Sequence, residues 1–268
     1  MTALSIRPAG AGDYPSFALL FPELDTGDRV PSAQRFCDEL AATSIIAERE
    51  GHTLGYAYFQ LIGTTGYIRN VVVARQARGR GVGAALMEAL RRLFRERGAQ
   101  TWELNVKPDN QAALRLYERC GMRLQHRATA LSVRWEVAET LPRPELAVAA
   151  RLVAPEDDSR FERALGLLDG QLRSGRALPG RMIVGLYKVG DDAPAGVALF
   201  DPGFPGASPY RVIHPSLVGT LLAGLKAQAQ PKQEQLGLFI ENDAEAVAVF
   251  VAAGAIVRLE ALHYHGAL

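Results

Sequence analysis

The sequence contains few cysteines and lysines, no long hydrophobic run and almost no net charge. Cys37 and Cys120 are its only cysteines and lie far apart, which excludes a disulfide framework or a cysteine-based metal knuckle. The longest apolar run, 246–257, is too short for a membrane span of about 20 residues, and the first residues lack the pattern of a secretory signal. A net charge of +1 is no global signature of nucleic-acid binding. These absences predict a reduced, cytoplasmic protein with neither a membrane nor a nucleic-acid partner.

Positive charge in this chain comes almost entirely from arginine. Only four of the 30 basic residues are lysines, and eight arginines lie between positions 69 and 97. Only Glu88 and Glu96 oppose them in that segment. The neutral total therefore conceals a local positive field.

The length of 268 residues predicts two domains. In the first half, hydrophobic periodicity predicts strands at 4–8, 44–50, 53–62, 66–74, 101–106 and 129–137, and helices at 14–22, 31–41, 110–120 and from Val82 to a stop at Gly98. This order predicts an α/β (α+β) fold with a mixed central sheet flanked by helices.

The second half repeats the first weakly after a proline-containing linker at 138–147. Helices are expected at 158–173 and 215–229, and strands at 181–188, 193–200, 209–213 and 234–241. Residues 110–122 parallel 243–255, so that Tyr117 is aligned with Phe250. The matching order favours a tandem duplication, with domains at 1–138 and 148–268.

The segment Arg78-Gly79-Arg80-Gly81-Val82-Gly83-Ala84 connects a predicted strand to a predicted helix. Glycines at alternate positions let the backbone turn tightly and approach a ligand closely. Their N–H groups and those of the first helical turn can form an anion-binding nest, to which the two arginines add charged donors. The segment predicts a pyrophosphate site.

A dinucleotide cofactor is one alternative ligand for this segment. Gly79, Gly81 and Ala84 also satisfy the G-x-G-x-x-G/A pattern, and Glu103 lies near the position of a ribose-binding acid. However, residues 75–78 intervene between the strand at 66–74 and the turn, and three strands precede that strand, whereas a dinucleotide-binding unit usually opens its domain. Because of these differences, the sequence favours another pyrophosphate ligand over the cofactor of an NAD-dependent dehydrogenase.

Two linked motifs resemble those of the GNAT acetyltransferase superfamily. The cofactor motif Q/R-x-x-G-x-G/A matches 78–83. The later motif N-x-x-A-x-x-L-Y-x-x-x-G-F matches Asn110, Ala113, Leu116, Tyr117 and Gly121, with Met122 in place of phenylalanine. The two motifs occur in the family's order, and the resemblance covers roughly residues 3–137. It implies two tandem GNAT-like domains, the second degenerate.

The resemblance implies an N-acetyltransferase that transfers acetyl from acetyl-CoA to a small-molecule or peptide amine by direct attack. Backbone groups of Val71 and Val73 would bind the pantetheine amides, 78–84 the pyrophosphate, and Asn110 the pantetheine arm. Tyr117 would act as the general acid that protonates the departing thiolate. A backbone N–H of 71–73 would stabilise the oxyanion.

The general base is left open between Glu103 and water. Some family members have a glutamate where this chain has Asn105, and Glu103 shares that strand face by alternation. No metal is expected, because His263 and His265 share a strand face without a nearby Cys, Asp or His.

The second half lacks the features that carry chemistry in the first. Its strand at 209–213 runs through a short turn into a helix without an R-x-x-G-x-G segment, and Phe250 has no proton to donate. We expect this half to be a packing partner or one wall of the acceptor cleft, in a monomer (a pseudo-dimer of two halves) or a homodimer. The alternative function is a non-catalytic acyl-CoA-binding or sensor module.

Overall fold

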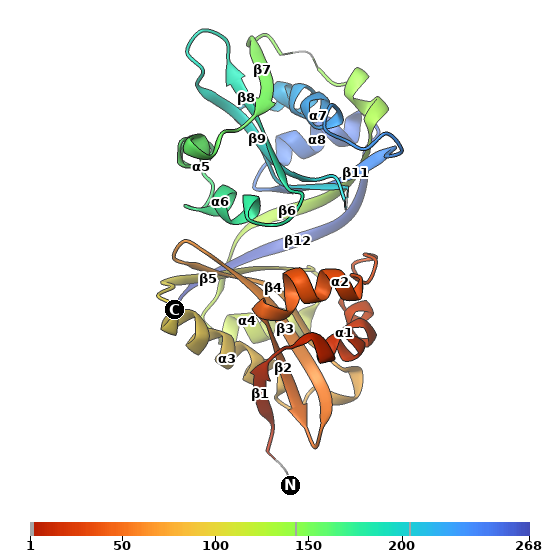
Figure 1. The fold of residues 1–268 in the computed structure, drawn as a ribbon, viewed down its shortest axis with the longest axis vertical. Helices are drawn as coiled ribbons and strands as arrows, with labels where there is room; N and C mark the ends of the chain where they lie inside the picture. Colours follow the sequence, from red (N-terminus) through yellow and green to blue (C-terminus); the bar gives the residue numbers. More distant parts are fainter. Residues whose placement is uncertain (1–2, 143, 204) are drawn as a thin grey trace. The chain divides into compact units, whose positions relative to one another are not determined.

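The computed structural model describes residues 3–142, 144–203 and 205–268, and its contacts divide the chain into two compact units (Figure 1). Unit 1 is the chain up to Gln125 together with His263–Leu268, and unit 2 is His126–Leu262. The division therefore falls before the linker expected at 138–147, and the end of the chain is part of unit 1. Separate functions for 1–138 and 148–268 stay predictions.

Unit 1 is a mixed sheet with helices on both faces. Its strands are β1 (Ser5–Pro8), β2 (Ser44–Arg49), β3 (His52–Ile62), β4 (Thr65–Val73) and β5 (Thr101–Val106), and its helices are α1 (Tyr14–Leu20), α2 (Ala33–Arg35), α3 (Val82–Glu96) and α4 (Gln111–Arg119). The strands are neighbours in numerical order, and β4 and β5 are the parallel pair among them. The predicted order and the mixed sheet are confirmed.

Each face of this sheet packs against a different group of helices. On one face, the apolar stripe of α3 is buried, and a Cβ at Gly66 of β4 would lie 2.4 Å from the Phe94 ring. On the other face, Phe17 of α1 packs on Tyr56 of β3 and on Phe36. The sheet therefore has an α3 face and an α1 face.

Several predicted helices are shorter than expected, for local reasons. The helix expected at 14–22 ends at Leu20 and continues as a 3-10 turn, Phe21–Leu24, because Pro22 lacks an N–H. The helix expected at 31–41 is α2 followed by a π-helical turn, Phe36–Leu40. The helix expected at 158–173 is interrupted by two glycines with positive φ and becomes α5 (Asp158–Leu165) and α6 (Gln171–Arg176).

Two long strands contribute residues to both units. β6 (Arg123–Arg134) begins before the strand expected at 129–137, and Trp135–Glu139 form a 3-10 turn after it. The last strand is β12 (Ile256–Ala267). The start of β6 belongs to unit 1 and its remainder to unit 2, whereas β12 begins in unit 2 and ends in unit 1.

Unit 2 repeats the element order of unit 1. Its other elements are β7 (Val148–Leu152), β8 (Met182–Lys188), β9 (Pro194–Asp201), β10 (Gly206–Val212), β11 (Gln235–Glu241), α7 (Val218–Lys226) and α8 (Ala244–Ala252). β7 to β11 are neighbours in numerical order, β10 and β11 are parallel, and β11 pairs with β6. Over the described ranges, no helix combines the length and the hydropathy that a membrane span requires.

Candidate functional site

β4 separates from β5 midway along its length, so that the second part of β4 has no partner among the described strands on that edge. β4 and β5 pair only from Thr65 with Thr101 to Ile68 with Leu104. β4 continues to Val73, still paired with β3 on its other edge, and a bulge at Arg69 accompanies the change. The end of β4 therefore presents an open edge to which an extended ligand could pair as an added strand would.

The backbone groups on this open edge belong to Val71 and Val73, the two positions expected to bind amides of the ligand. The N–H of Ala74 donates to the carbonyl of Leu54, and thus points toward β3. Because N–H and C=O groups alternate in direction along a strand, those of Val73 and Val71 point away from β3. Both residues are therefore oriented to bind the two amides of an extended ligand.

The loop after β4 gives the backbone the conformation that an anion nest requires. Gly79 and Gly81 have φ values of 73° and 80°, the left-handed region that favours glycine. A Cβ at either position would meet nothing within 4 Å, so the space beside both is open. Gly81 precedes the first turn of α3, where the N–H groups of Val82, Gly83 and Ala84 have no partner within the helix.

Gly83 joins the loop to the second motif. A Cβ at this position would lie 3.1 Å from Leu116 of α4 and 3.7 Å from Val73 of β4. The end of β4, the start of α3 and the middle of α4 therefore converge at one point. The structure thus brings together the two motifs that the sequence linked only by order.

The arginines of the loop differ in their contacts. Arg78 donates from Nε to the Val73 carbonyl at 3.2 Å and from Nη2 to Glu23 at 2.7 Å. Arg75 lies 3.9 Å from the same carboxylate. Arg80 is exposed. Glu23 is thus a counter-ion that sequence analysis missed, because it lies 55 residues before Arg78 with no local motif.

Asn110 has a structural contact of its own. It is the N-cap of α4, and its Oδ1 accepts the N–H of Ala113 at 3.2 Å. Its side-chain amide nitrogen is left to donate to a ligand, and the residue is exposed. Capping and the predicted ligand contact are therefore compatible.

Tyr117 lies on the buried side of α4 with 7% of its surface exposed. Burial, and secondarily the neighbouring Cys120, raises the pKa of Tyr117 well above its ordinary value of 10. The phenol is therefore neutral throughout the physiological pH range and carries a proton that it can donate. Tyr117 directly follows Leu116, which contacts the start of α3.

Glu103 is buried on the α1 face of the sheet. Trp102 lies on the α3 face, with its ring 4.9 Å from the guanidinium of Arg91, and alternation turns Glu103 the other way. Asn105 shares the face of Glu103 and donates to the Tyr67 hydroxyl at 2.6 Å. The imidazole of His263 lies 3.5 Å from the Glu103 carboxylate. Sequence analysis missed this pairing, because the two residues are 160 positions apart.

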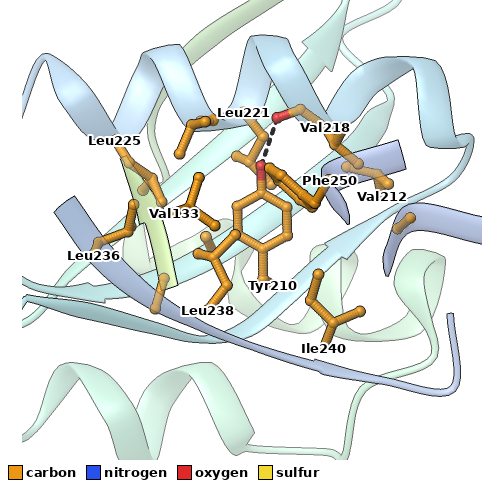
Figure 2. Packing of buried hydrophobic residues seen from close by; sticks show 14 of the residues in the cluster. Val133, Tyr210, Val212, Val218, Leu221, Leu225, Leu236, Leu238, Ile240 and Phe250 are labelled. Carbon is orange, nitrogen blue, oxygen red and sulfur yellow. Dashed lines mark hydrogen bonds between the residues drawn. The ribbon is translucent and has the colours of Figure 1, made fainter. Parts of the chain in front are cut away.

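The corresponding region of unit 2 is filled by side chains. β10 pairs with β11 only at Gly206 and Ala207, so its end also separates from the neighbouring strand. Figure 2 shows the Tyr210 ring between the sheet and α7, with its hydroxyl bonded to the Val218 carbonyl. Phe250, aligned with Tyr117, packs on this ring at 5.7 Å between centroids. Pro215 in the turn before α7 has no N–H to offer an anion.

Comparison with known proteins finds similarity in the first of these regions. Residues 14–122 match the model of the Acetyltransferase (GNAT) family. The chain is 36% identical over 105 residues to L-2,4-diaminobutyric acid acetyltransferase of Streptomyces coelicolor, covering 34% of this chain and 58% of that protein. It is 39% identical over 61 residues to N-alpha-acetyltransferase 30 of Schizosaccharomyces pombe, covering 22% and 41%. The chain spans about half the length of these curated relatives.

Solved structures extend the likeness to the whole chain. A GCN5-related N-acetyltransferase from Sphaerobacter thermophilus matches with a TM-score of 0.67 at 18% identity, over 98% of this chain and 95% of that one. A tandem GNAT protein from the clavulanic acid biosynthesis pathway matches with a TM-score of 0.61 at 18% identity, over 99% and 98%. The fold of the chain is therefore that of two tandem GNAT domains, as predicted.

Proposed function

We propose that this protein is an N-acetyltransferase in which unit 1 transfers acetyl from acetyl-CoA to a primary amine. The observation that carries the proposal is the open edge of β4, which leads directly into a left-handed glycine loop and the N-terminus of α3. A ligand with an extended diamide arm and a pyrophosphate fits that sequence of features. Acetyl-CoA is the family's acyl donor and has both.

The residues that would hold the donor are those of the open edge and the loop. Val71 and Val73 would pair with the amides of the pantetheine arm, and the amide of Asn110 would donate to it. The loop Arg78–Gly81 and the first turn of α3, Val82 to Ala84, would bind the pyrophosphate. The guanidinium of Arg78, already fixed on the Val73 carbonyl, would add a charged donor.

The chemistry proposed is direct attack of a neutral amine on the thioester carbonyl. The new C–N bond forms as the C–S bond breaks, and the amine loses one proton while the departing thiolate gains one. A backbone N–H on the β4 edge would stabilise the charge that develops on the carbonyl oxygen. Tyr117 would supply the proton to sulfur, and Glu103, directly or through water, would accept the proton from nitrogen.

The acceptor is proposed to be a small-molecule or peptide amine. The relatives include an enzyme named for L-2,4-diaminobutyric acid and one named as an N-alpha-acetyltransferase. Both classes present a primary amine. Unit 2 is proposed to have lost donor binding, since Tyr210 and Phe250 occupy the region that corresponds to the donor site.

An acceptor screen tests the reaction. Purified protein is mixed with acetyl-CoA and a panel of amines that begins with 2,4-diaminobutyrate and N-terminal peptides, and thiol release is followed. We expect release with at least one amine class. Tyr117→Phe should lower kcat roughly 10²-fold or more while the calorimetric Kd for CoA stays unchanged, because only the proton donor is lost. Tight CoA binding without release for any amine would favour the acyl-CoA sensor.

A matched pair of substitutions tests the donor site. Asn tolerates the left-handed backbone of Gly81 better than most residues, whereas Asp at the same position adds a negative charge beside the nest. We expect Gly81→Asp to weaken CoA binding far more than Gly81→Asn in calorimetry. Equal affinities would remove the pyrophosphate from this loop, and a thermal shift with NAD but not acetyl-CoA would favour the dehydrogenase.

A further inference from the structure

The last six residues of the chain, His263–Leu268, pack against the two elements that carry the proposed catalytic residues. The N–H of Leu268 donates to the carbonyl of Gln100, just before β5, at 2.9 Å. A Cβ at Gly266 would lie 2.9 Å from Trp102 Nε1 in β5 and 3.3 Å from the Gly121 carbonyl after α4. The end of β12 is therefore fitted tightly against β5 and the end of α4 within unit 1 (Figure 1).

His263 contacts the proposed base. Its Nε2 lies 3.5 Å from Oε2 of Glu103, and both side chains are more than nine-tenths buried. A buried carboxylate is costly in free energy unless another group compensates its charge or donates hydrogen bonds to it. The Tyr67 ring, which lies opposite Glu103 in the β4–β5 register, is 6.4 Å from the imidazole ring. The Glu103 carboxylate is thus held between β4 and the end of β12.

Tyr264 contacts the helix of the proposed acid. Its hydroxyl donates to Glu118 at 3.3 Å, and Glu118 directly follows Tyr117 in α4. Consecutive residues of one strand therefore reach Glu103 and the neighbour of Tyr117. Alternation along the strand explains how they reach elements on opposite faces of the sheet.

We infer that His263 and Tyr264 are positioning residues for acetyl transfer, His263 for the Glu103 carboxylate and Tyr264 for the turn of α4 that bears Tyr117. This inference rests on the proposed function of unit 1. It gives the second half a role in the reaction without a ligand of its own: this half delivers the strand that completes the acid–base pair of the first. A displacement of a catalytic group by about 1 Å can cost 10²-fold in rate, so loss of either contact should affect turnover.

Two substitutions at His263 separate positioning from packing. His263→Leu fills much of the same space but removes both ring nitrogens, whereas His263→Gln keeps a hydrogen-bond donor at the end of the side chain. With the best acceptor, we expect His263→Leu to lower kcat roughly 10- to 100-fold, with the Kd for CoA unchanged. His263→Gln should retain most of the kcat of the parent. His265→Leu, the same change two positions along the strand, should keep the activity of the parent.

A double-mutant cycle then ties the effect to Glu103. If His263 acts through this carboxylate, His263→Leu should cost little further activity in a Glu103→Gln background. Tyr264→Phe, which removes only the hydroxyl, should lower kcat by several-fold with CoA affinity kept. Should His263→Leu fail to fold, Tyr264→Phe still tests the inference, because it removes only the hydroxyl and keeps the ring.

The outcomes distinguish the inference from the proposed function. An active parent protein with an unchanged kcat in His263→Leu would overturn the inference and leave acetyl transfer standing. Additive losses for Glu103→Gln and His263→Leu would also overturn it, since the two residues would then act independently. A parent that binds CoA but acetylates no amine would overturn the proposed function, and the inference with it.

Discussion

Tyr117 illustrates how one residue can be both part of a core and an acid. Its ring packs in the buried side of α4, and the same burial raises the pKa of its hydroxyl. A phenol with a raised pKa keeps its proton until a strong base forms beside it, which in the proposed reaction is the departing thiolate. Burial and the proposed catalytic role are therefore consistent at this position.

The raised pKa of Tyr117 has a consequence for stability in alkali. Below pH 10 the folded and unfolded states both hold the proton, so the unfolding free energies of the parent and of Tyr117→Phe should differ by a constant amount. Above pH 10 the unfolded state releases the proton while the folded state retains it, which favours unfolding of the parent by up to about 1.4 kcal/mol per pH unit. Denaturant unfolding at pH 8 and pH 11 measures this. Parallel curves for the two proteins would contradict a raised pKa.

At the scale of elements, the arginines of the proposed pyrophosphate loop are paired with a carboxylate from another segment, which would compete with a bound phosphate. Glu23, in the 3-10 turn after α1, binds Arg78 and lies near Arg75. Asp25, two residues further on, is bound through both its carboxylate and its carbonyl by Lys107, which follows β5. The turn after α1 is thus held by cations from two other segments, one of them the proposed phosphate loop.

Removal of the Glu23 charge should strengthen donor binding. In Glu23→Gln, Arg78 and Arg75 no longer pair with an internal carboxylate, so they interact more strongly with phosphate. A half-exposed ion pair contributes about 0.2–1 kcal/mol, so we expect the calorimetric Kd for CoA to fall up to about fivefold. Glu96→Gln, the same change at an exposed position near the end of α3, should have little effect. A higher Kd in Glu23→Gln would instead assign Glu23 the role of holding Arg78 in place for the ligand.

The elements that sequence predicted well are those with local signals. The glycine segment between a strand and a helix, and the helix expected at 110–120, depend on residues close together in the chain, and the structure has α3 and α4 at those places. The break between α5 and α6 was missed, because the left-handed conformations of Gly166 and Gly170 are not required by their own residue type alone. The ion pairs of Glu23 and Glu103 were missed because each joins segments with no shared local pattern.

At the scale of the whole molecule, Gly266 tests how closely the last strand is fitted. Any side chain there must displace the fully buried Trp102 or the backbone after α4. We expect Gly266→Ala to lower the free energy of unfolding by about 1–3 kcal/mol in a denaturant titration. Gly12→Ala, at a position with open space and ordinary φ, is the control and should be near neutral. Equal stability of the two variants would show that the strand end is free to move away.

The sequence could not predict that β6 and β12 each contribute residues to both units. The alternating pattern of β6 and β12 predicts strands, but it does not say which sheet each strand joins. The linker expected at 138–147 would separate domains at 1–138 and 148–268. Instead, residues of β6 after Gln125 belong to unit 2 and residues of β12 after Leu262 belong to unit 1.

This exchange also sets an order for folding during synthesis. Residues up to Gln125 leave the ribosome well before His263–Leu268 are made. At about 5–20 residues per second, the first unit waits roughly ten seconds or more with the edge of β5 uncovered. The edge of β5 in a nascent chain therefore stays uncovered until His263–Leu268 have been synthesised, and a chain that stops before these residues has a first unit without the strand that covers this edge.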